Sequence, residues 1–267
     1  MLSALPPALS AGEYVRLPTS AHVVALTLDG GSDADGAASM LRTLFEHFTD
    51  AERRGKSGHG YSRIPWLESL DDLDPHAAPV REGGDDAYER WRGGGALGYL
   101  TLAAATARQL EHPPTDARVV VCSDCFPTGM LGHYVRRLAR GGLVGVLTAT
   151  SPPRLASPCG GPKLAGTNPL AIGIPSSDGR PLVADVSMGR VTYGDVIAGD
   201  ASEDELVPFG GEHAHKAFAF AVALQALVDS LVDPGGYGAV LLVARPRADP
   251  VPALRERAGG VRLPGDS

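Results

Sequence analysis

Apolar residues recur at helical spacing in several stretches of the chain. The first stretch has the i, i+3, i+4, i+7 pattern of an amphipathic helix at Leu41, Leu44, Phe45 and Phe48. We expect this helix to follow a cap at Asp35 and to run to about Arg53. Helical spacing or alanine-rich composition predicts three more helices, over 100–111, 130–138 and 216–232. A Pro-Pro pair after 111 and a Gly-Gly pair after 140 end two of them, because proline breaks a helix and glycine adopts its left-handed cap.

Short runs rich in β-branched and aliphatic residues lie between these helices. They predict strands over 22–28, 118–122, 143–148, 170–174, 182–186 and 239–244. The tight turn Asp178-Gly179 separates two of the strands, which implies antiparallel neighbours. The acidic segment 68–86 has no periodicity and is typical of a surface loop or an edge strand. The irregular alternation predicts an α/β fold with a mixed sheet, formed by residues 1–267 as a single unit with no separable linker.

Composition narrows the function classes. The 267 residues include 24 Lys plus Arg and 31 Asp plus Glu, for a net charge of −7. This balance argues against binding to nucleic acid or to an anionic membrane, which needs a basic surplus. The first residues lack a basic region and contain two prolines, so we expect no signal peptide. No apolar run reaches the ~18 residues of a membrane helix, and three cysteines cannot all pair; we expect a cytoplasmic protein.

Two motifs suggest ligand sites that the surrounding sequence does not favour. Gly93-Gly-Gly-Ala-Leu-Gly98 satisfies the G-x-G-x-x-G pattern of dinucleotide sites and precedes a predicted helix. However, the preceding 85–92 is too polar for the buried parallel strand of a Rossmann unit, so we favour a glycine-rich loop. Cys122-Ser-Asp-Cys125 resembles a redox dithiol, or a zinc site with Cys159 and His133. No second pair stands at metal spacing, so we favour buried or incidental thiols and expect no metal.

The pair His59 and Arg63 is a better candidate for chemistry. The two residues lie four positions apart in the glycine-broken stretch 54–66. Histidine can exchange a proton near neutral pH, and a guanidinium can hold a carboxylate in bidentate fashion. The residue types therefore suit a small acid, although a helix-capping histidine and a surface arginine explain them equally well.

Three further segments have a functional and a structural interpretation. The turn 166–175 carries Thr167 and Asn168, which can bind a ligand or only shape the turn. Asp185 ends an apolar strand, where a carboxylate faces a cleft or caps the strand. The segment 208–216 opens the longest predicted helix with His213, His215 and Lys216, which suits an anion, although the histidines could instead ligate a metal with a partner that the spacing does not reveal.

These pieces, in this order, resemble the malate/L-lactate dehydrogenase family of NAD(P)H-dependent oxidoreductases. The matching stretches are Gly58-His-Gly-Tyr-Ser-Arg-Ile-Pro65 for S-H-G-x-x-R-x-P, the 166–175 turn for G-T-N-P-L, and 185–194 for D-M-S-M-S-x-x-S-Y-G. Pro208-Phe-Gly-Gly, His215-Lys216 and 261–265 match as well. The resemblance implies a non-Rossmann α/β fold, a homodimer and either NADH or NADPH as cofactor.

The resemblance also implies roles for single residues. His59 would give a proton to a carbonyl or imine as hydride arrives, Arg63 would hold the substrate carboxylate, and Asp185 would orient the site. Cofactor-binding segments would include Thr167, Asn168, Pro169, Val183, Ala184, Val186, Ser187, His215, Lys216 and Gly265. The implied activity is reduction of a small 2-oxo acid or a cyclic ketimine carboxylate.

The chain also departs from the family pattern at several positions. Gly58 replaces the serine before the histidine, and Cys125-Phe-Pro-Thr128 stands where the family has S-N-H-F. Thr148-Ala149 replaces a T-N pair, and Lys216-Ala-Phe-Ala219 replaces K-G-Y-G. Since lost glycines can block the approach of a pyrophosphate, a second hypothesis stays open: a descendant without hydride transfer, acting as a non-redox acid–base enzyme or as a binding or scaffold subunit.

Overall fold

The computed structural model describes residues 14–16, 23–25, 34–71, 73–74 and 77–266, and all structural statements concern these. Its main sheet has seven strands in the order β10-β9-β6-β11-β5-β4-β3. All neighbours are antiparallel except β4 and β5, which run parallel. The strands are β3 (Val80–Gly84), β4 (Tyr88–Arg92), β5 (Ala117–Ser123), β6 (Val144–Ala149), β9 (Leu170–Ile174), β10 (Leu182–Val186) and β11 (Ala239–Ala244). The predicted mixed α/β sheet is confirmed.

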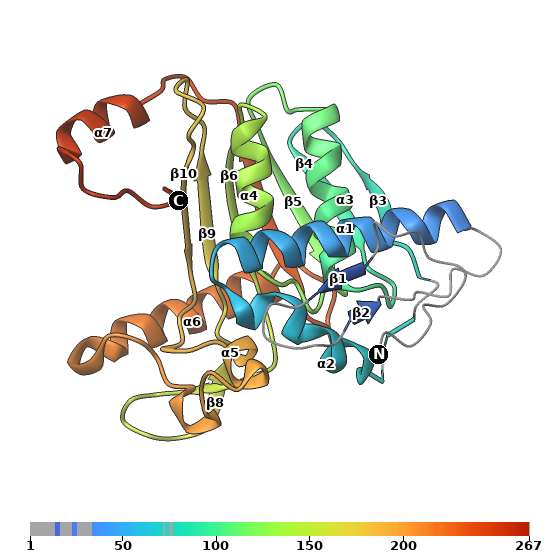
Figure 1. Cartoon of the computed structure of the whole chain (residues 1–267), viewed down its shortest axis with the longest axis vertical. Helices are drawn as coiled ribbons and strands as arrows, with labels where there is room; N and C mark the ends of the chain where they lie inside the picture. Colours follow the sequence, from blue (N-terminus) through green and yellow to red (C-terminus); the bar gives the residue numbers. More distant parts are fainter. Residues whose placement is uncertain (1–13, 17–22, 26–33, 72, 75–76, 267) are drawn as a thin grey trace.

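Helices cover both faces of this sheet (Figure 1). On one face lie α3 (Gly98–Glu111) and α4 (Leu131–Arg140), and across the other runs α6 (Ala214–Asp229). Alternation along β5 explains the two layers, since successive side chains point to opposite faces. Val120 packs in the cluster with α3 and α4, whereas Val121 packs against Val228 of α6.

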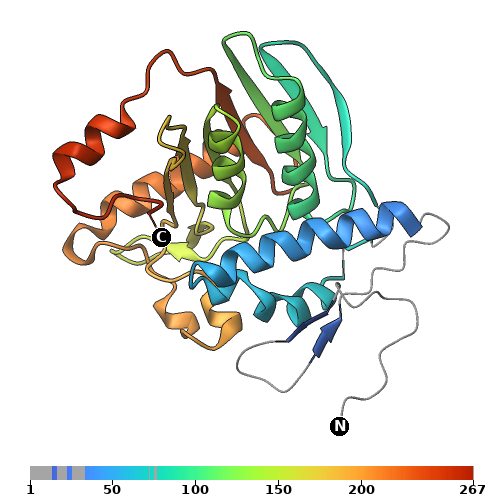
Figure 2. The ribbon, with the colours of Figure 1, turned by 45° about the horizontal axis from the view of Figure 1, so that its top comes forward.

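A third layer lies across one end of α3 and α4. It consists of α1 (Ala34–Arg53), the single 3₁₀ turns η2 (Ser57–His59) and η3 (Tyr61–Arg63), and α2 (Ile64–Glu68). Leu44 and Phe48 of α1 are buried against Tyr99 of α3, and Figure 2 shows α1 crossing the ends of both helices. This layer carries His59 and Arg63 toward the sheet.

The remaining elements are short. They are α5 (Tyr193–Ala198), α7 (Val251–Ala258), η4 (Glu203–Glu205), η5 (Gly211–His213) and the small strand pairs β1 (Tyr14–Arg16) with β2 (Val23–Ala25) and β7 (Leu155–Ala156) with β8 (Lys163–Ala165). Among the described residues, no helix has the length and apolar content needed to cross a membrane.

Most predicted elements are confirmed, with two differences at the N-terminal end. The helices correspond to α1, α3, α4 and α6, and the last five strands to β5, β6, β9, β10 and β11. Asp35 lies inside the first turn of α1, one residue after its start, rather than before it as a cap. The strand predicted over 22–28 is described only at Val23–Ala25, and the rest of it lies outside the described residues.

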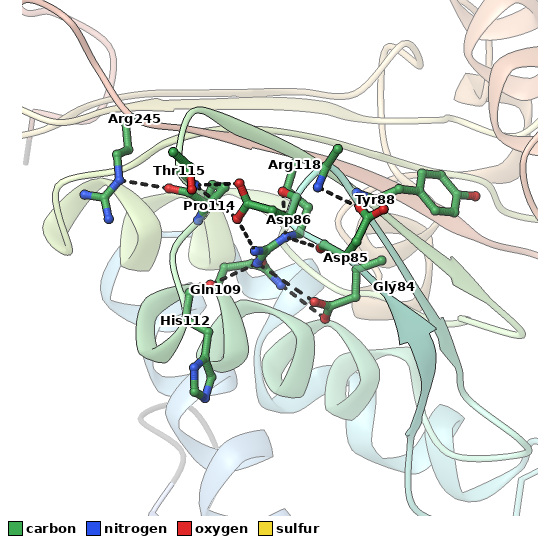
Figure 3. Close-up of polar contacts among 12 residues, drawn as sticks. Gly84, Asp85, Asp86, Tyr88, Gln109, His112, Pro114, Thr115, Arg118 and Arg245 are labelled. Atoms are coloured by element: carbon green, nitrogen blue, oxygen red, sulfur yellow. Dashed lines mark hydrogen bonds and ion pairs between the residues drawn. The ribbon is translucent and has the colours of Figure 1, made fainter.

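The interpretation of residues 85–92 as too polar for a parallel strand is wrong, because β4 pairs in parallel with β5. Glu89 makes this segment look too polar for a buried strand, yet its side chain is inside the protein and the residue is only 1% exposed. Its carboxylate accepts a hydrogen bond from the Trp91 indole (2.6 Å) and lies 3.9 Å from the Arg118 guanidinium. Figure 3 shows Arg118 at the centre of this polar cluster, with Gln109 and Asp86 around it.

The glycine run after β4 is nevertheless used for packing, as the loop interpretation expects. A side-chain carbon at Gly98 would lie 2.7 Å from the backbone nitrogen of Phe126, and one at Gly93 would collide with the carbonyl of Asp124. The first and last glycines of the run therefore allow this loop to pack closely against residues 124–127.

Candidate active site

A pocket of about 170 Å³ lies where η2, η3 and α2 meet the ends of β6 and β10 and the starts of α4 and α5. All three predicted catalytic residues, His59, Arg63 and Asp185, line it. Residues 126 apart in sequence thus share one cavity, because the third layer brings η2 and η3 to the end of the sheet where β10 ends.

Two consecutive 3₁₀ turns hold His59 and Arg63 on the same wall. The amide of His59 donates to the carbonyl of Lys56 (2.8 Å), and the amide of Arg63 donates to that of Gly60 (3.2 Å). Gly58, a departure from the family pattern, packs directly on α5. A side-chain carbon there would lie 2.6 Å from Oδ1 of Asp195 and 2.7 Å from the Asp195 amide nitrogen. Glycine at 58 therefore permits the close approach of α5 to this wall.

The His59 imidazole is held in its neutral form. Burial, and next the positive charge of Arg63, lower its pKa from 6.5 to about 4, while the Asp195 carboxylate acts in the opposite direction. Its Nδ1 atom is buried and has no hydrogen-bond partner among the described residues. A buried polar atom of this kind is costly unless a ligand or water completes it.

Arg63 is in the same situation. The residue is only 6% exposed, yet its Nε has no hydrogen-bond partner and no carboxylate of the described chain forms an ion pair with it. The guanidinium carbon lies 4.1 Å from the centre of the Trp66 ring. Stacking on an aromatic face orients a guanidinium without neutralising it. Arg63 is thus a fixed cation available to an external anion.

Asp185 lies on the opposite side, near the end of β10. Its Oδ2 accepts a hydrogen bond from the amide of Gly132 in the first turn of α4 (2.7 Å). A side chain at 132 would meet this carboxylate, which explains the glycine. The Asp185 carboxylate is open toward the pocket but surrounded by protein elsewhere, and this burial raises its pKa above the ordinary value.

Three of the ten residues expected at the cofactor line the pocket: Thr167, Pro169 and Ser187. Asn168 lies beneath them, fully buried, and its Nδ2 donates to the carbonyl of Ala221 (3.0 Å). Its backbone has a φ of 23°, in the left-handed region that asparagine tolerates. Asn168 therefore ties the 166–175 turn to α6 instead of facing the cavity.

The other expected cofactor residues lie outside the pocket lining. Val183 is buried in β10, and its amide donates to the carbonyl of Pro264 (3.1 Å), so the chain around Gly265 lies alongside β10. The structure thus brings together two segments that the resemblance links to the cofactor. Ala184 is half-buried, and Val186, His215 and Lys216 are exposed.

Several lining residues were not assigned to a site from the sequence. Asp195, Arg154 and Trp66 line the pocket, as do Tyr193 of the 185–194 match and residues 126–131 before and at the start of α4. One signal was available for Asp195: Thr192-Tyr-Gly-Asp195 is a capping box, in which Thr192 and Asp195 bond to each other's amides at the start of α5. Tyr193 lies in the 185–194 stretch that resembles the family motif, whereas nothing in the local sequence marks Arg154 or Trp66.

The cysteines show no site. Cys122 and Cys125 are buried and Cys159 is exposed, all with free thiols, and the Cys122 thiol beside Cys125 together with burial raises the pKa of Cys125. Within the described ranges, no group of three His, Cys, Asp or Glu side chains is placed to hold a metal.

The fold agrees with comparisons to known proteins. Residues 30–212 match the model of the malate/L-lactate dehydrogenase family, so the chain belongs to that family. It is 34% identical over 161 residues to (2R)-3-sulfolactate dehydrogenase (NADP(+)) of Chromohalobacter salexigens, covering 55% of this chain and 45% of that protein. It is 30% identical over 184 residues to 2,3-diketo-L-gulonate reductase of Citrobacter koseri, covering 66% and 53%.

A solved structure has a similar fold. The Δ1-piperideine-2-carboxylate reductase of Pseudomonas syringae superposes with a TM-score of 0.75 at 25% identity, covering 90% of this chain and 86% of that one. By sequence, this chain spans about half the length of the first two curated relatives that it matches, 45% and 50%.

Proposed function

We propose that the protein is an NAD(P)H-dependent reductase of a small 2-oxo acid or a cyclic ketimine carboxylate. One observation carries the proposal: half-buried His59 and buried Arg63 line the same pocket, and each has a buried polar atom without a partner in the described chain. An imidazole beside a free guanidinium is suited to an acid that must be gripped at its carboxylate and protonated nearby. The named reductases among the relatives support the reaction class.

The pocket chemistry fits a nicotinamide. Ser151 and Thr167 line the pocket, and their hydroxyl groups can bond to a carboxamide or to ribose hydroxyls. The hydroxyls of Thr150 and Ser187, also at the pocket, bond to Gly238 and to the 167–189 backbone instead. When bound, the nicotinamide would supply a hydride, that is, a proton with two electrons, to the carbon of the substrate C=O or C=N bond.

Arg63 would hold the substrate carboxylate and thereby fix the reacting carbon. As that carbon accepts the hydride, the π electrons of C=O or C=N move to the heteroatom, which takes its proton from His59. Asp195 would hold the imidazolium in place before the transfer, since its carboxylate favours the charged form of His59. Asp185 is the candidate for orienting the opposite side of the site.

The low pKa of His59 fits a role that depends on bound substrate. Without an anion in the pocket, burial and Arg63 keep the imidazole neutral. A substrate carboxylate on Arg63 would offset that positive charge and raise the pKa of His59. Proton uptake would therefore accompany substrate binding, and reduction should accelerate as pH falls.

A second function is favoured by one observation: Phe126 and Pro127 line the pocket where the family motif has Asn-His. Apolar groups in that place would suit a descendant that binds acids without hydride transfer.

Nucleotide binding separates the two functions. If the reductase proposal is right, NADH or NADPH at a hundredfold excess over its dissociation constant should stabilise the fold by about 2.7 kcal/mol. Calorimetric melting with each nucleotide measures this. Absence of a shift with both nucleotides at millimolar concentration would refute the reductase and leave the non-redox function.

The His59→Ala variant tests the proton donor. It should still bind the nucleotide, whereas kcat should fall by about a hundredfold or more. His112→Ala, on an exposed histidine at the end of α3, is the matched control and should leave kcat unchanged. An unchanged rate in His59→Ala would remove His59 from the mechanism.

We also propose, from the family resemblance, that the protein is a homodimer, which sedimentation analysis would test. A cytoplasmic location stays a prediction from the sequence.

A further inference from the structure

The pocket holds a second guanidinium for which the proposed mechanism has no use. Arg154, just before β7, lines the cavity, and its side chain has no hydrogen bond or ion pair with any residue in the described part of the chain. Arg90, Arg92 and Arg255, which lie away from the pocket, each pair with two carboxylates. Arg63 and Arg154 differ from these three in that both line one cavity without a carboxylate partner among the described residues.

Two aromatic side chains fix the two guanidinium groups relative to each other. Arg63 stacks on Trp66 at 4.1 Å, and Arg154 stacks on Tyr193 at 3.3 Å, measured from the guanidinium carbon to the ring centre. The Trp66 and Tyr193 rings are in turn in edge-to-face contact, with centres 6.1 Å apart. A cation–π contact positions a guanidinium and leaves its N–H groups free for an anion.

The acids of the pocket do not neutralise these cations. Asp185 accepts the amide of Gly132. Oδ2 of Asp195 accepts the amide and hydroxyl of Thr192. Neither carboxylate forms an ion pair with a described residue. With Lys56 also on the wall, three cations face two carboxylates, so the lining carries a surplus positive charge in a chain whose net charge is −7.

We propose that Arg154 binds a second anionic group of the substrate, while Arg63 binds the 2-oxo carboxylate. The substrate class is then a 2-oxo acid with an additional carboxylate or sulfonate, rather than a monocarboxylate ketimine. This inference rests on the proposed reductase function. Arg154 and Tyr193, which aims it, are specificity-determining residues that touch the far end of the substrate and leave the reacting carbon to His59.

The test compares acids of equal chain length. Oxaloacetate and 2-oxobutyrate both have four carbons and differ in the second carboxylate, and 3-sulfopyruvate tests a sulfonate. The native protein should have a kcat/KM at least tenfold higher for a doubly charged acid. Whichever of the two is the better substrate distinguishes carboxylate from sulfonate. Equal kcat/KM for all three acids would overturn the inference.

Arg154→Gln should reduce the preference for the doubly charged acid by about tenfold to a hundredfold, the loss expected for one charge-assisted contact. Arg154→Lys keeps the charge but loses the planar stack, so its preference for the doubly charged acid should lie between those of the native protein and Arg154→Gln. Arg247→Gln removes the same charge from a residue whose side chain is 93% exposed and should leave the preference unchanged. A preference that survives in Arg154→Gln would overturn the inference. So would a tenfold rise in the KM for the nucleotide, because Arg154 would then bind a cofactor phosphate.

A binding measurement separates this inference from the reductase proposal. Calorimetric titration with succinate and butyrate needs no turnover. Succinate should bind at least tenfold more tightly than butyrate to the native protein, and Arg154→Gln should abolish the difference. If no acid is reduced but this result holds, the reductase fails and the second anion site stands. If acids are reduced but succinate has no advantage, the second site fails and the reductase stands.

Discussion

Arg118 and Arg63 are buried to the same extent, 6% exposed each, yet their surroundings are opposite. Arg118 donates to Gln109 (2.6 Å), to the carbonyl of His112 (2.9 Å) and to Asp86 (3.0 Å), as Figure 3 shows. Arg63 has an aromatic ring beneath it and an unpartnered Nε. The first guanidinium is satisfied by the chain itself, and the second is not.

This difference separates structural from functional burial of charge. The chain surrounds Arg118 with acceptors because it joins β5 to the end of α3 and to the start of β4, where Glu89 needs a cation. Around Arg63 the fold supplies orientation through Trp66 and no counter-charge. An unpaired buried charge costs stability. An unpaired guanidinium at a pocket wall therefore indicates a ligand whose negative charge would pair with Arg63.

The largest expected effect comes from breaking the satisfied cluster. Arg118→Met leaves the buried Glu89 carboxylate with only Arg81, at 3.4 Å, as an ion-pair partner. We expect the free energy of unfolding to fall by about 3–5 kcal/mol, the usual result of removing one partner of a buried pair. Denaturant titration measures it.

The double variant Arg118→Met/Glu89→Gln provides the control. Removing both charges should recover part of the lost stability, because no uncompensated carboxylate remains. A loss below about 1 kcal/mol in Arg118→Met would show that the cluster does not hold β4 in the sheet.

The equivalent substitution at the pocket, Arg63→Met, should reduce activity strongly and change stability little. Arg63→Met should change the free energy of unfolding by no more than about 1 kcal/mol, since no partner loses its charge and methionine can lie on Trp66. With a carboxylate substrate, kcat/KM should fall by about a hundredfold, equivalent to about 2.7 kcal/mol of lost carboxylate binding. Melting and steady-state rates of this variant together test the comparison, and destabilisation as large as that of Arg118→Met would break it.

The smallest effect concerns Asp195. Its carboxylate raises the pKa of His59 against burial and Arg63, so Asp195→Asn should lower that pKa further. Fewer imidazoles are then protonated at a given pH, and the pH profile of reduction should shift to lower pH with up to about a tenfold slower rate at neutral pH.

A matched variant checks this shift. Glu205→Gln removes a carboxylate from the equivalent capping box at η4, which the pocket does not include, and should leave the profile in place. If the Asp195→Asn profile also stays in place, Asp195 only caps α5.

Periodicity located most elements because their buried faces are apolar. It failed at β4, where Glu89 occupies an inward position and its charge is balanced by Arg118 on β5, a neighbour in the sheet that is distant in sequence. A residue whose partner is distant in sequence cannot be judged by its neighbours. The glycine run 93–98 illustrates the converse: the motif is present, but its first and last glycines serve close packing against residues 124–127.

The candidate site was found from the sequence only in part. The spacing of His59 and Arg63 within η2 and η3 identified the wall, because both lie in one short segment. Arg154 has no local signal, and Tyr193 lies in the 185–194 motif match without a role assigned to it. Only their contacts in the fold join them to Arg63. Asn168 looked like a ligand group and instead bonds to α6.

The amino-acid sequence by itself determined the helices, most of the strands, the mixed α/β class and the candidate pair His59 and Arg63, because these depend on local spacing and residue type. The tertiary structure alone decided which buried charges are neutralised. Whether a guanidinium finds acceptors or an open cavity depends on segments that approach from elsewhere in the chain, and local sequence contains no record of that approach.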